Sequence, residues 1–240
     1  MEATPHDVAW GANPRTKTCY GDGTFPRHED RIKLIPRELW KPVSLRRHVD
    51  HIFSQLDGMC TANGAVMTLE IERSFRGAAH NPELSPEYLY GQVAQWGEGS
   101  GLDEILKSLA ENGCCTRQEV PRIDGHLHRS WPENHEDLAG ANRMLEWVDL
   151  NASFDAVATA LQLHKPCLVG VRWPGGGGHA ICVTELFSYP AAQLTADPTW
   201  CIGGPNSWGS AWGDDGFYTL TERQCGDFSQ FGCWAAGTST

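Results

Sequence analysis

Gly204-Pro205-Asn206-Ser207-Trp208-Gly209-Ser210-Ala211-Trp212-Gly213-Asp214-Asp215-Gly216-Phe217-Tyr218 is the stretch of this 240-residue chain that decides its fold. It places an asparagine beside two Trp-Gly pairs, a combination that ordinary turn chemistry does not explain. Upstream lie Cys60 and His179, and His179 directly follows a run of four glycines. A cysteine, a histidine and an asparagine in this order can serve as a nucleophile, its base and the group that orients the base.

Cys60 begins a segment with helical spacing, because small and apolar residues recur three, four and seven positions apart from Ala62 to Leu69. We expect a helix whose first residue carries the thiol. The helix dipole and a nearby imidazolium would both lower the pKa of that thiol. A lone cysteine is more often a small buried core residue, but the histidine and the asparagine downstream favour a nucleophile.

His179 precedes an apolar strand, which would hold its imidazole rigidly as a general base and acid. Asn206 would hydrogen-bond the far ring nitrogen and fix the tautomer, and Trp208 would keep water from that bond. Gln55 would donate its side-chain amide to the developing oxyanion, together with the backbone N–H of Cys60.

The chain changes character near Pro166, from helical to β-rich. Helices are expected from Cys60, from Ser85-Pro86-Glu87 to about Trp96, from Leu102 to Gly113, and from Ser153 to about Leu163. Strands are expected at residues 167–173, 180–184 and 217–221. The pattern predicts an α+β protein with two halves that face each other across a cleft.

These motifs resemble those of the papain-like cysteine peptidases, over roughly residues 35–225. The similarity includes the Asn206-Ser-Trp-Gly block, Leu84-Ser-Pro-Glu-Tyr-Leu-Tyr, and Cys60-Thr-Ala-Asn, which is similar to a microbial branch of the family. The resemblance implies a helical left lobe at about 50–120 and a β-barrel-like right lobe at about 121–240. It also implies that Cys60, His179, Asn206 and Gln55 have the roles given above, and that an extended peptide binds along Gly99-Ser100-Gly101.

Three features depart from the family pattern. The spacing from Gln55 to Cys60 is one position shorter than usual, which puts Ser54 where the glutamine normally stands. Met59 replaces the serine that usually precedes the nucleophile. Residues 1–34 are polar and rich in turns, and they are too short for the usual inhibitory pro-region. We divide the chain into an irregular arm, 1–34, and a peptidase domain, 35–240.

The composition excludes several other functions. A net charge of −11 disfavours nucleic-acid binding. No run of 18 apolar residues exists, so no membrane span is expected, and no cysteine or histidine pair has zinc spacing. No metal or cofactor is therefore expected. No signal peptide is visible, which predicts a protein that is cytoplasmic as synthesised, with most of its nine cysteines reduced and Cys225–Cys233 as the pair best placed for any bridge.

The sequence leaves three functions open. The first is thiol-dependent hydrolysis of peptide bonds, with a peptide or protein as the substrate. The second is a papain-like fold with little or no catalysis, serving as a structural or binding component of a larger assembly such as a virus particle. The third is a thiol acyltransferase or amidase with the same order of catalytic residues.

Overall fold

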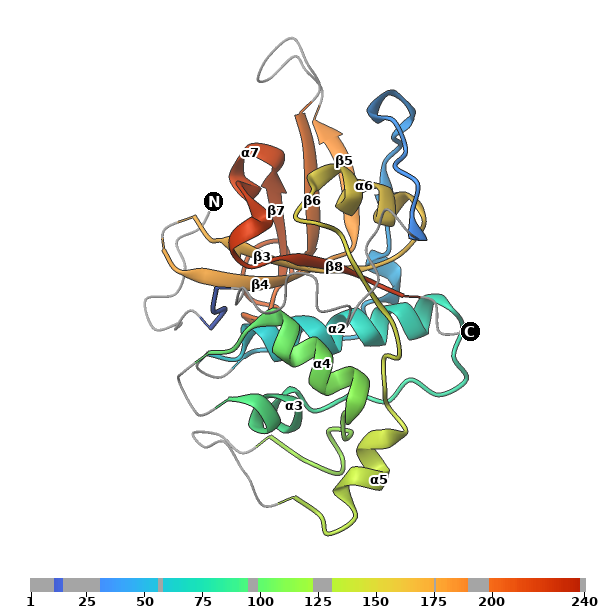
Figure 1. The fold of residues 1–240 in the computed structure, drawn as a ribbon, viewed down its shortest axis with the longest axis vertical. Coiled ribbons are helices and arrows are strands. Elements are labelled where there is room, and N and C mark those ends of the chain that lie inside the picture. Colours follow the sequence, from blue (N-terminus) through green and yellow to red (C-terminus); the bar gives the residue numbers. More distant parts are fainter. Residues whose placement is uncertain are drawn as a thin grey trace.

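The chain folds into a helical lobe and a β-rich lobe in the computed structural model, which describes residues 11–14, 31–55, 58–94, 99–122, 131–174, 176–189 and 199–237 (Figure 1). The helical lobe contains α2 (Cys60–Phe75), α3 (Pro86–Val93), α4 (Leu102–Glu111) and α5 (His135–Gly140). The side chain of Ser85 caps α3 by accepting from the N–H of Tyr88, and Gly113, with a φ of 83°, follows the end of α4. The expected helix starts are therefore confirmed, and α3 ends three residues earlier than predicted.

The β-rich lobe is built from two four-stranded antiparallel sheets. One has the order β1-β5-β6-β7 and the other β2-β8-β3-β4. The strands are β1 (Val43–Ser44), β2 (Trp147–Asp149), β3 (Cys167–Arg172), β4 (Gly178–Val183), β5 (Glu185–Tyr189), β6 (Thr199–Pro205), β7 (Phe217–Thr221) and β8 (Cys233–Ala236). The three strands expected from the sequence are confirmed as β3, β4 and β7, so the α+β prediction is correct.

Short helices complete this lobe: η2 (Arg37–Leu39), η3 (Arg46–His48), α6 (Phe154–Gln162), α7 (Glu222–Cys225) and η5 (Phe228–Gln230). Ser153 caps α6, as predicted, by accepting from the N–H of Ala156. Ile32 and Trp40 are buried in the same apolar cluster as the strands. Residues 31–40 therefore pack on the β-rich lobe, whereas most of the predicted arm, residues 1–10 and 15–30, lies outside the described residues.

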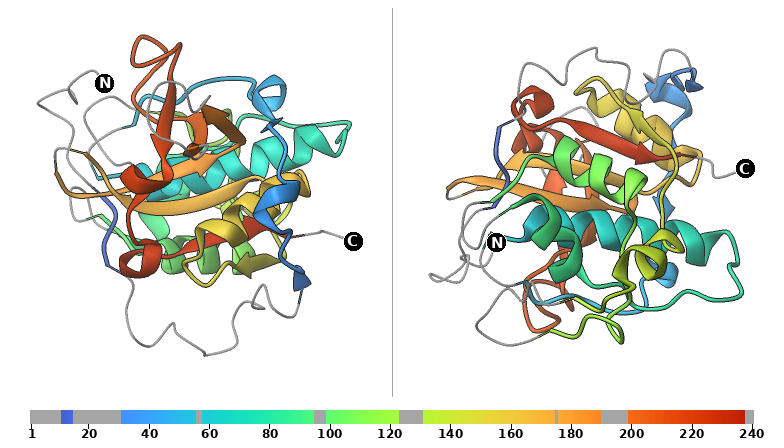
Figure 2. Two further views of the ribbon diagram at one scale, coloured as in Figure 1. Left: turned by 90° about the horizontal axis from the view of Figure 1, so that it is seen from above. Right: turned by 60° about the horizontal axis from the view of Figure 1, so that its bottom comes forward.

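The two lobes meet where α2 packs against β4 and β3, an arrangement seen from two further directions in Figure 2. Alternation along the strands divides their side chains between two apolar cores. Leu168, Ala180 and Cys182 belong to the core of the helical lobe, while Val169 and Ile181 belong to the core of the β-rich lobe. The sheet β2-β8-β3-β4 thus forms the boundary between the lobes, and the first residue of α2 lies at that boundary.

The eight cysteines in the described part of the chain are all buried, free thiols, so the bridge between Cys225 and Cys233 is not formed. None of the described helices is long and apolar enough to cross a membrane.

Candidate active site

Cys60 lies at the N-terminus of α2, the position that the sequence predicted for the nucleophile. Gly58, with a φ of 72°, makes the sharp turn before the helix, and only glycine adopts this conformation readily. The Cys60 side chain is completely buried, and its sulfur accepts a hydrogen bond of 3.4 Å from the backbone N–H of Ala180. Since Ala180 directly follows His179, the strand that carries the predicted base runs past the predicted nucleophile.

His179 and Asn206 are joined by a hydrogen bond of 2.8 Å between Nε2 and Oδ1. The same Asn206 oxygen accepts a second bond of 2.8 Å from the backbone N–H of Ser207. A carbonyl oxygen can only accept, so Nε2 of His179 must carry a proton. In neutral His179 the other nitrogen, Nδ1, is therefore the basic one, which is the state that a general base requires.

Two tryptophans enclose the imidazole. The ring of Trp208 stacks on His179 with centroids 4.7 Å apart and an angle of 28°, and Trp173 meets His179 edge-on at 5.1 Å. His179 and Asn206 are almost completely buried. Trp208 thus lies where the sequence predicted a cover for the His–Asn bond, and the low dielectric there strengthens that bond.

Gln55 is held beside the Asn206-Ser207 pair. The hydroxyl of Ser207 donates to Oε1 of Gln55 at 2.5 Å, and the backbone N–H of Gln55 donates to the Ser207 carbonyl at 2.7 Å. Because Oε1 accepts from Ser207, the Nε2 of Gln55 is the group left to donate. Nε2 is buried without a hydrogen-bond partner among the described residues. A buried, unpaired donor of this kind suits an oxyanion, whereas Ser54, the alternative donor, has an exposed side chain.

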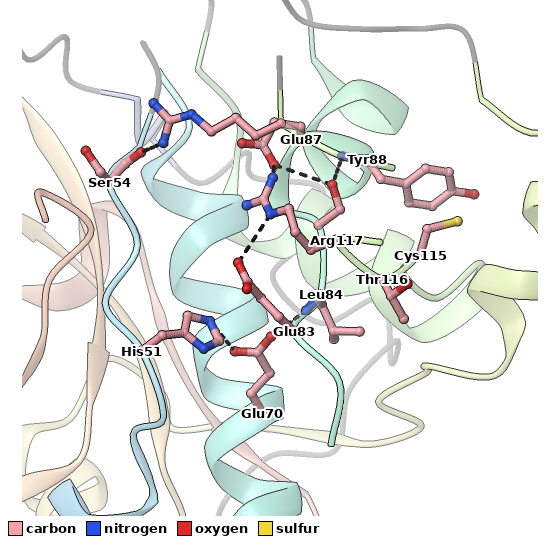
Figure 3. A network of polar contacts seen from close by, with 12 residues as sticks. His51, Ser54, Glu70, Glu83, Leu84, Glu87, Tyr88, Cys115, Thr116 and Arg117 are labelled. Atoms are coloured by element: carbon pink, nitrogen blue, oxygen red, sulfur yellow. Dashed lines mark hydrogen bonds and ion pairs between the residues drawn. The ribbon is translucent and has the colours of Figure 1, made fainter. Parts of the chain in front are cut away.

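Polar contacts connect the segment before Gln55 to the helical lobe (Figure 3). His51 lies 3.2 Å from the buried carboxylate of Glu70 on α2, which also accepts a 2.6 Å hydrogen bond from the N–H of Leu84. Arg122 donates to the carbonyl of Ser54. These contacts fix residues 51–55 relative to the helix that begins with Cys60.

The arm segment, residues 11–14, crosses over Cys60 between the two lobes. On the helical side, Ser100 donates its N–H to the Gly11 carbonyl at 2.8 Å, and Asn13 donates to the Ser100 carbonyl at 2.9 Å. On the other side, Ala12 donates to the carbonyl of Gly178 at 3.3 Å. The N–H of Gly11 also faces the Cys60 sulfur.

Glycines make this crossing possible. A Cβ on Gly11 would lie 1.9 Å from the carbonyl oxygen of Gly58. A Cβ on Gly99 would lie 2.4 Å from the Gly11 carbonyl, and one on Gly178 would lie 2.4 Å from the Ala12 carbonyl. The arm segment therefore fits because Gly11, Gly99 and Gly178 carry no side chain.

Among the predicted substrate-binding residues, Gly99 and Ser100 contact the arm segment, and Gly101 begins α4. The Ser100 hydroxyl is buried against that of Thr61 at 2.6 Å, and Thr61 directly follows Cys60. The N–H of Gly101 donates to the carboxylate of Glu104 at 2.9 Å. Ser100, one of the predicted substrate-binding residues, thus lies beside the first turn of α2.

Burial dominates the ionisation of Cys60 and His179 in this closed arrangement. It raises the pKa of the Cys60 thiol to about 11, against hydrogen bonds from Ala180 and Gly11 that lower it. Burial also lowers the pKa of His179 to about 4, against the bond to Asn206 that raises it. Both shifts favour the neutral forms, against the thiolate expected at the helix N-terminus.

The sequence did not predict three residues that lie at the candidate active site. Ala12 and Gly178 are far apart in the chain and pair with each other through backbone atoms. Such a contact leaves no local pattern in the sequence. Trp173 is visible only as a strand end. Within the described residues, no group of three or more His, Cys, Asp or Glu could hold a metal ion.

Comparison with known proteins gives one relative by sequence and several by fold. No family model matches the chain. Cathepsin B-like CP2 of Giardia intestinalis is 28% identical over 190 residues, which are 68% of this chain and 61% of that protein. The chain thus spans about three fifths of the length of this relative.

Three solved structures illustrate the likeness in fold. Xylellain, a cysteine protease from Xylella fastidiosa, superposes with a TM-score of 0.76 at 17% identity and full coverage of both chains. Procathepsin B S9 from Trypanosoma congolense gives 0.68 at 15% identity, with 96% of this chain and 86% of that chain covered. Digestive procathepsin L 3 of Tenebrio molitor gives 0.67 at 14% identity, with 95% and 76% covered.

Each of these proteins is named as a cysteine protease or a cathepsin. The fold of this chain is that of the papain-like cysteine peptidases. The sequence relative, a cathepsin B-like protein by name, is consistent with that fold.

Proposed function

We propose that the chain hydrolyses peptide bonds through a thioester on Cys60. The observation that carries this proposal is the buried His179–Asn206 hydrogen bond of 2.8 Å, under Trp208 and beside the helix that begins with Cys60. That bond leaves Nδ1 of His179 as the basic nitrogen, and the fold is shared with known cysteine proteases.

The chemistry follows from these positions. His179 takes the proton of Cys60, and the thiolate attacks the carbonyl carbon of the substrate. Nε2 of Gln55 and the backbone N–H of Cys60 stabilise the oxyanion, where the loss of one donor would cost on the order of 3 kcal/mol. His179 then protonates the leaving amine, and it later activates the water that cleaves the thioester.

The arm segment must leave before a peptide can bind, because it occupies the backbone groups of Ser100 and Gly178 that would pair with a substrate. It also presents an N–H to the sulfur, whereas a substrate must present a carbonyl carbon. This closed arrangement is the one observation that favours the second candidate function, a papain-like fold used as a structural or binding component of a larger assembly.

The first experiment is intact-mass spectrometry after treatment with a peptidyl epoxide that alkylates activated thiols. We expect a single adduct on the native chain and none on Cys60→Ala, followed by turnover of fluorogenic peptides that the same variant lacks. Peptide cleavage by a folded Cys60→Ala protein would refute the mechanism. A folded, reduced chain without adduct or turnover would favour the structural role.

A further inference from the structure

The two groups that would stabilise the oxyanion belong to different lobes. Gln55 is attached to the β-rich lobe, because its backbone N–H donates to the Ser207 carbonyl and its Oε1 accepts from the Ser207 hydroxyl. The backbone N–H of Cys60 belongs to the first turn of α2 in the helical lobe. Two donors stabilise one oxyanion only when both lie at hydrogen-bonding distance from it. The contacts that hold residues 51–55 against α2 therefore decide whether the two donors converge.

His51 is the only ionisable residue of the segment 51–55. Its Nε2 lies 3.2 Å from Oε2 of Glu70 on α2, and Figure 3 shows the two side chains directed at each other. The other oxygen of this carboxylate accepts at 2.6 Å from the backbone N–H of Leu84, so Glu70 is held from two sides. The imidazole also meets the ring of Phe53 edge-on, with centroids 4.5 Å apart. His51 thus lies between α2 and Phe53, two residues before Gln55.

Phe53 connects the imidazole to the backbone around Gln55. Its side chain is almost fully buried in the core of the helical lobe, and its carbonyl accepts at 2.9 Å from the N–H of Gly209. The next residue, Ser54, pairs with Trp208 as an isolated antiparallel bridge. Because a packed core has few alternative arrangements, a movement of the His51 ring displaces Phe53 and the backbone that carries Gln55.

The surroundings of His51 favour its protonated form. Three carboxylates face the ring: Asp50 precedes it in the chain, Glu70 comes from α2, and Glu83 lies in the segment before α3. Burial lowers the pKa of His51, but Glu70 and then the charges of Glu83 and Asp50 raise it, and the pKa is raised overall. The side chain is 30% exposed and borders a cavity of about 40 Å³, so water can reach the ring and exchange its proton.

The other cations near this contact have partners or tend to be neutral. His48, on η3, lines the same cavity, but burial and a neighbouring arginine lower its pKa below 6.5. Arg73 faces Glu70 from the same helix and donates to a side-chain amide oxygen at 2.9 Å. Arg117 forms an ion pair of 3.3 Å with Glu83. Among the described residues, the imidazole of residue 51 is therefore the group that both contacts Glu70 and changes its charge near neutral pH.

We propose that His51, in its protonated form, is a positioning residue for Gln55, and that its ion pair with Glu70 holds the two oxyanion donors together. This inference rests on the proposed peptidase function. Protonated His51 is attracted to the buried carboxylate, which keeps residues 51–55 against α2. Neutral His51 keeps at most a hydrogen bond to Glu70 and loses the attraction between charges.

The pair exists within a pH window. Because the pKa of His51 is raised, its proton is present below pH 6.5, and it is lost as the pH rises through the raised value. Burial raises the pKa of Glu70, against the contact with His51 that lowers it, so the carboxylate is protonated as the pH falls through that raised value. Positioning of Gln55 should therefore be best in mildly acidic solution and should weaken toward alkaline pH.

The test compares kcat and KM for one fluorogenic peptide between pH 6 and 8 in the native chain and in His51→Lys, whose ammonium stays charged over this range. Loss of a whole oxyanion donor lowers kcat about 10²- to 10³-fold, and a displaced donor costs less. We expect the ratio of kcat at pH 6 to kcat at pH 8 to be about tenfold larger in the native chain than in His51→Lys, with the same change of KM in both. A merely structural role would not separate the two kcat profiles of folded proteins.

Two further variants complete the comparison. Glu70→Gln keeps an oxygen for the N–H of Leu84 but removes the charge. It should have at pH 6 the low kcat that the native chain has at pH 8, and it covers the case in which His51→Lys does not fold. His48→Gln is the matched control, because His48 lines the same cavity but contacts Ser74 and Phe75 instead of Glu70. It should keep the native profile.

A second measurement separates the position of Gln55 from the ionisation of Cys60. A peptide nitrile adds the Cys60 sulfur to its carbon: the S–C bond forms, one π bond of the nitrile breaks, and the thiol proton ends on the nitrogen, which occupies the oxyanion position. Iodoacetamide alkylates the same sulfur with loss of iodide and places no atom there. Between pH 6 and 8, the Kd of the nitrile, followed by tryptophan fluorescence, should rise about tenfold more in the native chain than in His51→Lys. The rates of alkylation by iodoacetamide should have the same pH dependence in both.

The outcomes distinguish this inference from the peptidase function. Turnover with the same kcat profile in the native chain and in His51→Lys would overturn the positioning role and leave the peptidase intact. Alkylation profiles that differ between the two would also overturn it, because His51 would then act on Cys60. A native chain that cleaves no peptide would refute the peptidase. In that case pH-dependent binding of the nitrile that His51→Lys makes constant would support the positioning role, and no binding at any pH would refute it.

Discussion

Replacing Gly11 with alanine should open the active site. The new Cβ would lie 1.9 Å from the carbonyl oxygen of Gly58, a backbone atom that cannot swing away as a flexible side chain does. The arm segment must therefore lift from the floor. Lifting breaks or weakens the bonds from Ser100 to the Gly11 carbonyl, 2.8 Å, and from Ala12 to Gly178, 3.3 Å.

The size of the effect follows from those two bonds. Each contributes about 0.5–1.5 kcal/mol net, so their loss disfavours the closed arrangement by about 1–3 kcal/mol. At 1.4 kcal/mol for each factor of ten, the ratio of closed to open chains falls about 5- to 150-fold. If the native chain is mostly closed, the open fraction rises by the same factor, and so does the rate of any reaction that needs the open state.

The assay is the second-order rate of Cys60 alkylation by the peptidyl epoxide at pH 7, followed by intact mass. Gly140→Ala is the matched control, because the same substitution at the end of α5 places its Cβ no closer than 3.5 Å to the Arg143 side chain, an ordinary van der Waals contact. We expect the Gly11→Ala rate to rise at least fivefold and the Gly140→Ala rate to stay within twofold of the native value. An unchanged or lower rate for Gly11→Ala, at an unchanged melting temperature, would refute the reasoning.

Three further predictions concern the catalytic groups and the support behind them. Asn206→Ala should lower kcat/KM less than His179→Ala does, because the imidazole still adopts the reactive tautomer part of the time; equal losses in folded variants would contradict the orienting role. With a pKa of about 11, Cys60 in the native chain should be alkylated about tenfold faster for each pH unit between 7 and 9. The alkylation rate of Gly11→Ala, measured over the same range, should depend less steeply on pH. Burial opposes protonation of His51, but the hydrogen bond and charge of Glu70 raise its pKa overall, so this contribution to stability is complete below pH 6.5 and is lost as the pH rises through the raised value. Glu70→Gln should therefore reduce the fall in melting temperature between pH 6 and 8, and an identical fall would show that the pair does not titrate there.

The parts of this molecule that the sequence predicted are those with local chemical signatures. Ser85 and Ser153 cap their helices because a hydroxyl accepts from an N–H three residues later, which is a short-range rule. The Asn206-Ser-Trp-Gly block was equally informative, because each of its side chains is used: Asn206 for the imidazole, Ser207 for Gln55, and Trp208 for the cover.

The parts that could not be predicted depend on backbone pairing between distant segments. Nothing in Gly11-Ala12 distinguishes it from an exposed turn, and its partners Ser100 and Gly178 lie far along the chain. Phe231 is similar, because its place is decided by two glycines on neighbouring strands rather than by its own surroundings in sequence. A glycine allows another segment to approach closely, but it does not say which segment does so. Only the folded structure shows which segment occupies the space.

The closed arm segment affects the chemistry as well as access. Burial in the closed arrangement raises the pKa of the Cys60 thiol to about 11 and lowers the pKa of His179 to about 4, so it disfavours transfer of the proton from Cys60 to His179. Burial is the largest cause at both residues, and it outweighs the hydrogen bond that the sulfur receives from Gly11. When the arm segment leaves, the sulfur loses that one donor but regains water, so we expect the two pKa values to move toward each other. We therefore expect departure of the arm segment both to admit a substrate and to favour the thiolate of Cys60.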